Sequence, residues 1–289
     1  MSSMGSYWSS EEPYMPAPPP RQLNEQDFTR MERTVMASAA ARVTMQEGEV
    51  LLKSLTSAAK RIAQSDGAFL SNAAKAELCG IMDAMRPEHL GLELPARSNS
   101  APKAPLIVRT QIVWASEEFE IDIFLFPDGA SLPLHDHPNM TVLSKVLYGR
   151  LGVRSYDWET QPTAAEYTAF EAELERQESP DPARRAAAPL VPPRAAYRRP
   201  DAMLTSDAAT TSLNPMEANV HAFVAHGATA VIDLLLPPYN DDAGRDCHYF
   251  DDGDSAGASS GAQSPVMLRA AAPPDTLIIK GAPFLGPRV

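Results

Sequence analysis

Two histidines, His135 and His137, stand two positions apart in the run that follows Pro133. Neutral imidazole is a common ligand for iron, copper, zinc and nickel, so two such rings would supply half of a metal site. On a β-strand, side chains two positions apart point to the same face, and both rings would then enter one space. A His-x-His pair also arises by chance in many chains. The pair therefore needs a third ligand and a suitable fold around it.

The residues around the pair are typical of a cupin, the small β-barrel or jelly roll. Gly129 precedes His135 by five intervening residues, and Gly149 closes the apolar run that follows. This spacing is the first half of a cupin signature. Many cupins place a glutamate ligand a few residues after the second histidine, but here the segment Met140–Val142 offers no carboxylate. The third ligand must come from elsewhere in the chain.

His221 is the best candidate for that third ligand. It lies just before residues 230–236, a run rich in Val, Ile and Leu that is typical of a strand. His226 follows five residues later, and an odd offset on a strand puts it on the opposite face. His248 lies beside Cys247 in a polar segment, where we expect a surface residue.

Longer runs of the chain resemble the thiol dioxygenases, the family that includes the plant cysteine oxidases and the animal 2-aminoethanethiol dioxygenase. The likeness extends from about residue 25 to the end, with gaps, and is strongest for the plant branch. Asn139 is a departure, because the family usually has Gly at that position. The matching runs are Pro133–Gly149, Ser155–Trp158, Asn219–His221, Asp233–Tyr239, Arg245–Phe250 and Gly281–Val289.

The resemblance implies a mainly β fold, a cupin-type double-stranded β-helix with an N-terminal helical lobe. It also implies Fe(II) held by His135, His137 and His221, and oxidation of an N-terminal cysteine by O2 to the sulfinic acid. In the plant branch this oxidation marks transcriptional regulators for arginylation and degradation when oxygen is present. The implied function is an oxygen-sensing step of the N-degron pathway and hypoxia response, in the cytoplasm and nucleus, with N-terminal-Cys proteins or peptides as substrates.

Two other functions stay open on the same residues. A small aminothiol such as cysteamine could be the substrate, with identical chemistry. Alternatively, the chain could be a cupin that binds a metal without turnover, and zinc also accepts three histidines and a water. Metal analysis combined with oxygen-consumption measurements would separate the binding protein from the two oxidases.

Three more residues are candidates for catalytic roles. Asp233 lies in an apolar run, where a carboxylate is costly to bury unless it is paired. We expect its partner to be a ligand-histidine N–H, a water near the metal or the substrate amine; the alternative is an outward-facing residue of a half-buried strand. Tyr239 is expected to donate a hydrogen bond near the pocket. Cys247 lies two residues from Tyr249, which allows either a thioether cross-link or, more simply, two packed side chains.

Composition narrows the class of protein further. The 289 residues carry a formal net charge of −12, which argues against a nucleic-acid-binding surface. The 2 cysteines are too few for a secreted disulfide framework. The N-terminus has no apolar stretch of the kind found in signal peptides, and no run approaches the length of a membrane span. We expect a soluble, monomeric intracellular protein.

The pattern of the chain predicts helices first and strands afterwards. Residues 1–24 are rich in Ser, Pro and Glu and read as a disordered tail, and residues 25–289 as a single domain. A helical lobe is expected over about 27–92, with a break at Gly48 and a second helix capped by Asn72. The barrel is expected over about 104–289, with strands near 106–114, 119–125, 141–148, 153–156, 230–236 and 276–280.

Residues 159–212 interrupt the strand pattern. The segment is rich in Ala and Pro, acidic at first and then basic, and it predicts a low-complexity surface insertion with a short helix around 164–177. We expect removal of residues 178–200 to leave folding nearly unchanged, because periodic apolar residues are lacking there. A second low-complexity loop is expected over 251–263.

Overall fold

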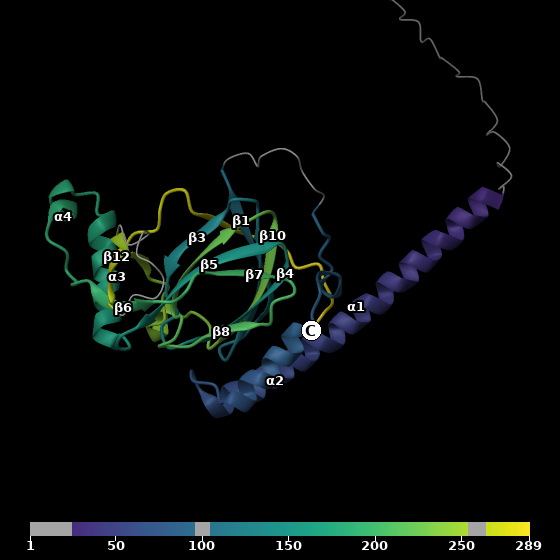
Figure 1. Cartoon of the computed structure of the whole chain (residues 1–289), viewed down its shortest axis with the longest axis horizontal. Helices are drawn as coiled ribbons and strands as arrows, with labels where there is room; N and C mark the ends of the chain where they lie inside the picture. The colour runs from purple at the N-terminus through teal and green to yellow at the C-terminus, as the bar shows by residue number, and fades with distance from the viewer. Residues whose placement is uncertain (1–24, 96–104, 254–263) are drawn as a thin grey trace, which may run out of the picture. The chain divides into compact units, whose positions relative to one another are not determined.

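A computed structural model describes residues 25–95, 105–253 and 264–289, with side chains from residue 40 onward. The predicted disordered tail and most of the loop predicted over 251–263 lie outside the described residues. The chain divides into two compact units, residues 1–42 and 43–289. The second unit contains all the strands found among the described residues, and the following description concerns it (Figure 1).

The first of two β-sheets has six strands in the order β13-β1-β2-β10-β4-β8. Its pairings are antiparallel except that of β1 with β13, which is parallel. Its strands are β1 (Ile107–Ala115), β2 (Glu120–Phe126), β4 (Thr141–Tyr148), β8 (Thr211–Leu213), β10 (Thr229–Leu236) and β13 (Ile278–Gly281).

The second sheet has seven strands in the order β6-β12-β11-β3-β9-β5-β7, and β6 also pairs with β5. All its pairings are antiparallel. Together the sheets form the predicted cupin-type barrel, so the expected fold class is confirmed. The strands of this sheet are β3 (Ser131–His135), β5 (Arg150–Trp158), β6 (Arg194–Arg198), β7 (Ala202–Thr205), β9 (Val220–Ala225), β11 (Tyr249–Asp251) and β12 (Val266–Ala271).

Strand β10 shows how the barrel wall is buried on both faces. All eight of its residues are buried. Val231 packs with Val146 of β4 and Phe223 of β9 in the barrel interior. Ile232 and Leu234, on the other face, pack against the helical lobe. Because both faces of the strand are buried, nearly all of its residues are apolar. Asp233 is the charged exception, and its burial needs a physical reason.

The helical lobe consists of α1 (Glu25–Asp66), α2 (Asn72–Asp83) and a 3-10 turn, η1 (Pro87–Leu90). Leu55 of α1 and Leu78 of α2 are fully buried in one cluster with the outer face of the first sheet. The predicted N-cap is one residue off, because Ser71, and not Asn72, accepts a hydrogen bond from the Ala74 amide at 3.2 Å. None of the described helices has the length and hydropathy of a bilayer-spanning segment.

The predicted break of α1 at Gly48 is wrong, since the helix continues through it. A Cβ at Gly48 would lie 1.8 Å from the carbonyl oxygen of His89. Glycine is therefore required here for close packing of the helix on η1, and the modest cost of glycine in a helix is outweighed by that packing.

The expectation for residues 159–212 is partly wrong. The short helix is confirmed as α3 (Ala164–Glu178), but α4 (Pro182–Ala186) and the strands β6, β7 and β8 follow it. Tyr167 and Phe170, three positions apart on α3, are buried against the second sheet together with Ala196 of β6. Strand β6 pairs with both β12 and β5 through its backbone, which requires no apolar periodicity. The segment is therefore part of the barrel.

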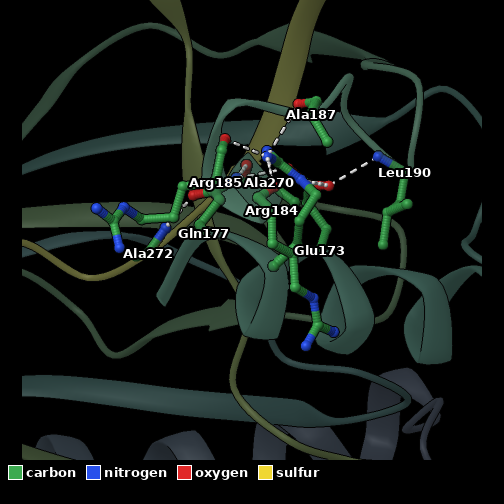
Figure 2. Close-up of polar contacts among 9 residues, drawn as sticks. Glu173, Gln177, Arg184, Arg185, Ala187, Leu190, Ala270 and Ala272 are labelled. Carbon is green, nitrogen blue, oxygen red and sulfur yellow. Dashed lines mark hydrogen bonds and ion pairs between the residues drawn. The ribbon is translucent and has the colours of Figure 1, made fainter. Parts of the chain in front are cut away.

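A buried ion pair fastens this segment (Figure 2). The guanidinium of Arg176 donates to Glu173 at 2.6 Å and 2.9 Å, and both side chains are less than a tenth exposed. Arg176 also donates to the backbone carbonyls of Arg184, Arg185 and Ala187. Leu190 donates its amide to Glu173. Each group of the pair thus finds several partners, as buried charges require.

Candidate metal centre

The three predicted ligands, His135, His137 and His221, meet inside the barrel. His135 ends β3 and lies directly opposite His221 of β9 in the strand register, and His137 follows two residues after His135. Their ligand atoms all lie within 4.8 Å of one another, and Nε2 of His137 is 3.1 Å from Nε2 of His221. Among the described residues, this is the group of His, Cys, Asp and Glu side chains that could hold a metal ion.

The second nitrogens of two of these rings are held in place. Nδ1 of His135 lies 2.8 Å from the Pro133 carbonyl oxygen, which can only accept, so this nitrogen carries the proton. The Tyr239 hydroxyl donates to the Asp136 carbonyl at 2.7 Å and lies 2.8 Å from Nδ1 of His137. A protonated Nδ1 of His137 can then donate to the Tyr239 oxygen. Both rings are left with Nε2 free to bind a metal, as second hydrogen bonds commonly ensure in metal sites.

Burial favours the neutral form of all three imidazoles. It lowers the pKa of His135, and it lowers the pKa of His137 and His221 well below the usual value, with a further contribution from the neighbouring histidines. Neutral imidazole is the form that binds metals. Three nitrogen donors without a carboxylate fit a divalent transition metal such as iron or zinc, so the donor set is suitable for the predicted ion.

Asn219 is a fully buried residue of the centre to which the sequence assigned no role. Its side-chain nitrogen donates to the His137 carbonyl at 2.9 Å, and its oxygen accepts from the His137 amide at 3.3 Å. The indole N–H of Trp158 donates to the same oxygen at 3.2 Å. Asn219 therefore fixes the backbone of one candidate ligand. Its position two residues before His221 was visible in the sequence, but its contact across 82 positions was not.

Asn139, which stands where the family usually has Gly, adopts a φ of +53° just after the histidine pair. This left-handed conformation explains a preference for Gly, and Asn is among the residues that tolerate it best.

The prediction that His248 is a surface residue is wrong, because it is 4% exposed. Asp136 lies between His135 and His137 in the sequence and is 0% exposed. Its carboxylate accepts a hydrogen bond from the His248 backbone amide at 2.9 Å. The same carboxylate oxygen lies 3.1 Å from Nδ1 of His248. Burial disfavours a charged His248, but the hydrogen bond and charge of Asp136 outweigh it, so its pKa is raised.

Tyr239 lies where the sequence predicted, as a hydrogen-bonding residue beside the histidines. The Cys247 thiol lies close enough to the hydroxyls of Tyr239 and Tyr249 to raise their pKa values further, beyond the larger effect of burial. Burial, with a contribution from Asp136, raises the pKa of Cys247 to about 12, which keeps it a protonated thiol. The side chains of Cys247 and Tyr249 are thus neighbours, and whether they cross-link stays a prediction.

Asp233 lies on the same face of β10 as Val231, which packs in the barrel interior. Its cross-strand neighbours are Asp122 of β2 and Ser144 of β4, and within the described residues it is not among the side-chain hydrogen-bond partners of the three histidines. Burial raises its pKa to about 7, although a hydrogen bond with Ser144 acts in the opposite direction. Burial, a hydrogen bond with Glu120 and the charges of Glu120 and Asp233 raise the pKa of Asp122 to about 8. The predicted link of Asp233 to a ligand is therefore not seen.

His226 is exposed and lies outside the centre, in agreement with its odd offset from His221. A cavity of about 380 Å³ opens from His221 instead. Its walls are mainly aliphatic, and its polar members besides His221 are Ser144, Ser155, Arg199, Thr211 and Ser212. Strands β7 and β8 and the stretch before them supply one side through Arg199, Pro200, Ala202, Leu204, Thr211, Ser212 and Leu213. The segment expected to be a spare surface insertion thus forms a wall of the cavity.

Two packed sheets with three buried histidines at their centre define a cupin with a candidate three-histidine metal site. The PCO_ADO family model matches residues 81–289, and the chain belongs to this family, as its resemblance predicted.

Two relatives from different kingdoms illustrate the match. Plant cysteine oxidase 2 of Arabidopsis thaliana is 34% identical over 179 residues, which are 61% of this chain and 56% of the relative. The human 2-aminoethanethiol dioxygenase is 29% identical over 222 residues, which are 74% of this chain and 80% of that protein. The chain thus spans just over half the length of the plant relatives it matches. Among solved structures, a cupin superfamily protein of Desulfitobacterium hafniense is 15% identical, with 50% of this chain and 84% of that one covered and a TM-score of 0.28.

Proposed function

We propose that this protein is an Fe(II)-dependent thiol dioxygenase that oxidises the N-terminal cysteine of proteins or peptides to cysteine sulfinic acid, with both oxygen atoms taken from O2. The observation that carries the proposal is the set of three buried neutral imidazoles without a carboxylate ligand, in a chain of the PCO_ADO family.

His135, His137 and His221 would hold the iron through their Nε2 atoms. The iron, when bound, supplies a site for the substrate sulfur and the electron transfer that ground-state O2 requires. Three ligands on one face leave room for further groups, and a neutral ligand set favours an anionic sulfur donor. Tyr239 and Asn219 orient His137, one through the ring and the other through the backbone.

The protons of the substrate need acceptors, and we assign this role to Asp233. A free α-amino group titrates at about 7.7–8.0, so at neutral pH it arrives mostly as an ammonium. Asp233, with a pKa raised to about 7, can take that proton and leave a neutral amine. Ser144 connects Asp233 to the cavity, because it contacts Asp233 and lines the cavity wall.

The shape of the cavity favours a substrate with a chain beyond its first residue. The space reaches from His221 to Arg199 and Pro200, and its volume of about 380 Å³ is within the range of cavities that bind larger ligands. Its aliphatic walls suit apolar or small side chains after the cysteine. We extend the proposal to an oxygen-sensing step that feeds N-degron degradation of transcriptional regulators in the cytoplasm and nucleus.

Mass spectrometry with three substrates tests the proposal. A peptide that begins with free Cys should gain about 32 Da, the two oxygen atoms of a sulfinic acid, and about 36 Da under 18O2. The same peptide with an acetylated N-terminus should be inert, since its nitrogen can neither bind a metal nor lose a proton to Asp233. Efficient turnover of cysteamine without turnover of the peptide would move the assignment to a small-aminothiol dioxygenase. Iron binding without any turnover would leave a metal-binding cupin.

A further inference from the structure

Helix α3 has no role in the function proposed above. Its aromatic residues nevertheless contact His248, which hydrogen-bonds Asp136 between the candidate ligands His135 and His137. The ring of Tyr167 stacks on the imidazole of His248, with centroids 5.3 Å apart and an angle of 18° between the planes. Phe170 meets the same imidazole edge-on, at 5.6 Å and 64°. The Tyr167 hydroxyl is buried without a hydrogen-bond partner among the described residues. The contact is therefore made by the ring and not by the hydroxyl.

His248 passes this contact on to the loop between the candidate ligands. Besides the two contacts of the Asp136 carboxylate already described, the Asp136 amide donates to the His248 carbonyl at 3.1 Å. Three contacts thus join His248 to a residue that directly adjoins both His135 and His137. One of these contacts is made by the His248 ring and two by its backbone, so a displaced His248 would disturb Asp136, the residue between the two imidazoles.

Helix α3 is fixed to its surroundings by the polar side chains Glu173, Arg176 and Gln177. The buried pair of Glu173 and Arg176 ties it to the segment through α4 (Figure 2). Gln177 donates to the Ala270 carbonyl at 2.9 Å and accepts from the Ala272 amide at 3.0 Å, which fastens the helix to β12 and the residue just after it. Strand β12 pairs with β11, and β11 pairs with β3 at His135. The anchor and the ring contacts therefore act on the same part of the sheet.

We propose that α3 is a positioning element of the metal centre: Tyr167 and Phe170 hold the His248 ring, and His248 holds Asp136 and the loop that carries His135 and His137. The inference rests on the metal centre of the proposed function but not on its substrate or its turnover. Loss of a direct partner of a metal ligand commonly changes metal affinity by about 10–100-fold, and Tyr167 acts from further out, so we expect the low end of this range.

Binding of Co(II) to the metal-free full-length protein tests this without reference to activity. Tyr167→Leu keeps an apolar side chain but removes the stacked ring, and we expect about tenfold weaker Co(II) binding together with a changed visible absorption spectrum of the bound ion. Tyr167→Phe retains the ring and should restore the affinity and the spectrum of the unmodified protein. Leu78→Ala, a core change on α2, serves as the control: it should lower the melting temperature while the affinity and the spectrum stay unchanged.

A double-mutant cycle decides whether the effect passes through His248. Tyr167→Leu should weaken Co(II) binding little or not at all in a protein that already carries His248→Ala, because the ring it supports is gone. Unchanged affinity and spectrum in Tyr167→Leu would overturn the proposal, and so would fully additive effects in the cycle. Failure of the unmodified protein to bind Co(II) would instead contradict the metal centre, and an inactive protein with normal Co(II) binding would contradict only the proposed reaction.

Discussion

At the scale of single residues, the candidate ligands depend on neighbours that hold their rings. Pro133 holds His135 through a backbone carbonyl, which no substitution of a side chain removes. His137 depends on the Tyr239 hydroxyl at 2.8 Å from Nδ1. The same hydroxyl donates to the Asp136 carbonyl, so it connects a ring and the backbone of the same loop. Tyr239 is therefore a sensitive point of the centre.

Tyr239→Phe should weaken metal binding by about 10-fold or more, because Nδ1 of His137 loses its partner while the ring volume is kept. A competition titration with a coloured chelator measures the affinity. Tyr197→Phe is the matched control, since the exposed Tyr197 hydroxyl also makes a hydrogen bond, to Glu159, far from the histidines in sequence. Equal affinity of the two variants would show that Tyr239 does not orient the ligand.

The carboxylates of Asp122 and Asp233 predict a loss of stability with rising pH. The pKa of Asp122 is raised to about 8, above its unfolded value of 3.8. The folded protein therefore favours the protonated carboxyl, so this contribution to stability is full below about pH 4 and is lost as the pH rises through about 8.

Asp122→Asn should reduce this dependence, while the part that comes from Asp233, whose pKa is raised to about 7, should remain. It should raise the free energy of unfolding by on the order of a few kcal/mol at pH 8, and by much less at pH 5, since each pKa unit corresponds to about 1.4 kcal/mol. Urea unfolding at the two pH values measures it. Asp207→Asn, at an exposed carboxylate, should have no effect at either pH. A destabilised Asp122→Asn protein at pH 8 would contradict the assignment.

At the scale of elements, residues 159–212 changed most between sequence and structure. Strand β6 pairs with both β12 and β5, and Arg176 donates hydrogen bonds to three backbone carbonyls of the segment. The expectation that residues 178–200 are dispensable is therefore replaced by its opposite.

Deletion of residues 178–200 should lower the melting temperature by roughly 10 °C or more, because the strand ladder and the partners of a buried ion pair are lost together, at about 2–4 °C per kcal/mol. Differential scanning calorimetry measures the change. Arg184→Ala in the same segment removes only an exposed ion pair with Glu175 and should shift the midpoint by a degree or two at most. A deletion protein as stable as the full chain would show that β6 contributes nothing to the barrel.

At the scale of the whole molecule, the metal centre joins parts of the chain that are far apart in sequence. His135 and His137 come from β3 and its loop, and His221 comes from β9, 84 residues after His137. A metal ion bound by all three would stabilise the folded state, since the unfolded chain does not hold the three ligands together.

Saturating Fe(II) under anaerobic conditions should therefore raise the melting temperature of the unmodified protein. At a metal concentration 100 times the dissociation constant, binding adds about 2.7 kcal/mol to the free energy of unfolding. His221→Ala should lose most of this shift and most of the bound iron. His226→Ala should retain both, because its side chain is exposed and outside the centre. An unchanged shift in His221→Ala would remove that residue from the ligand set.

Features that depend on local pattern could be predicted from the amino-acid sequence. Strand alternation and helical spacing located most elements of the barrel and lobe, and His135 and His137 were paired by their two-residue spacing. His221 came from the resemblance together with its strand-like context. Tertiary structure decided what depends on contacts across the chain. The folded structure pairs Asp122 with Asp233 across two strands and joins His248 to Asp136 by a hydrogen bond. It also packs the 159–212 segment against the second sheet. Such contacts follow from strand pairing and burial over tens of residues, and a polar or Ala- and Pro-rich run carries no local periodicity that would report them.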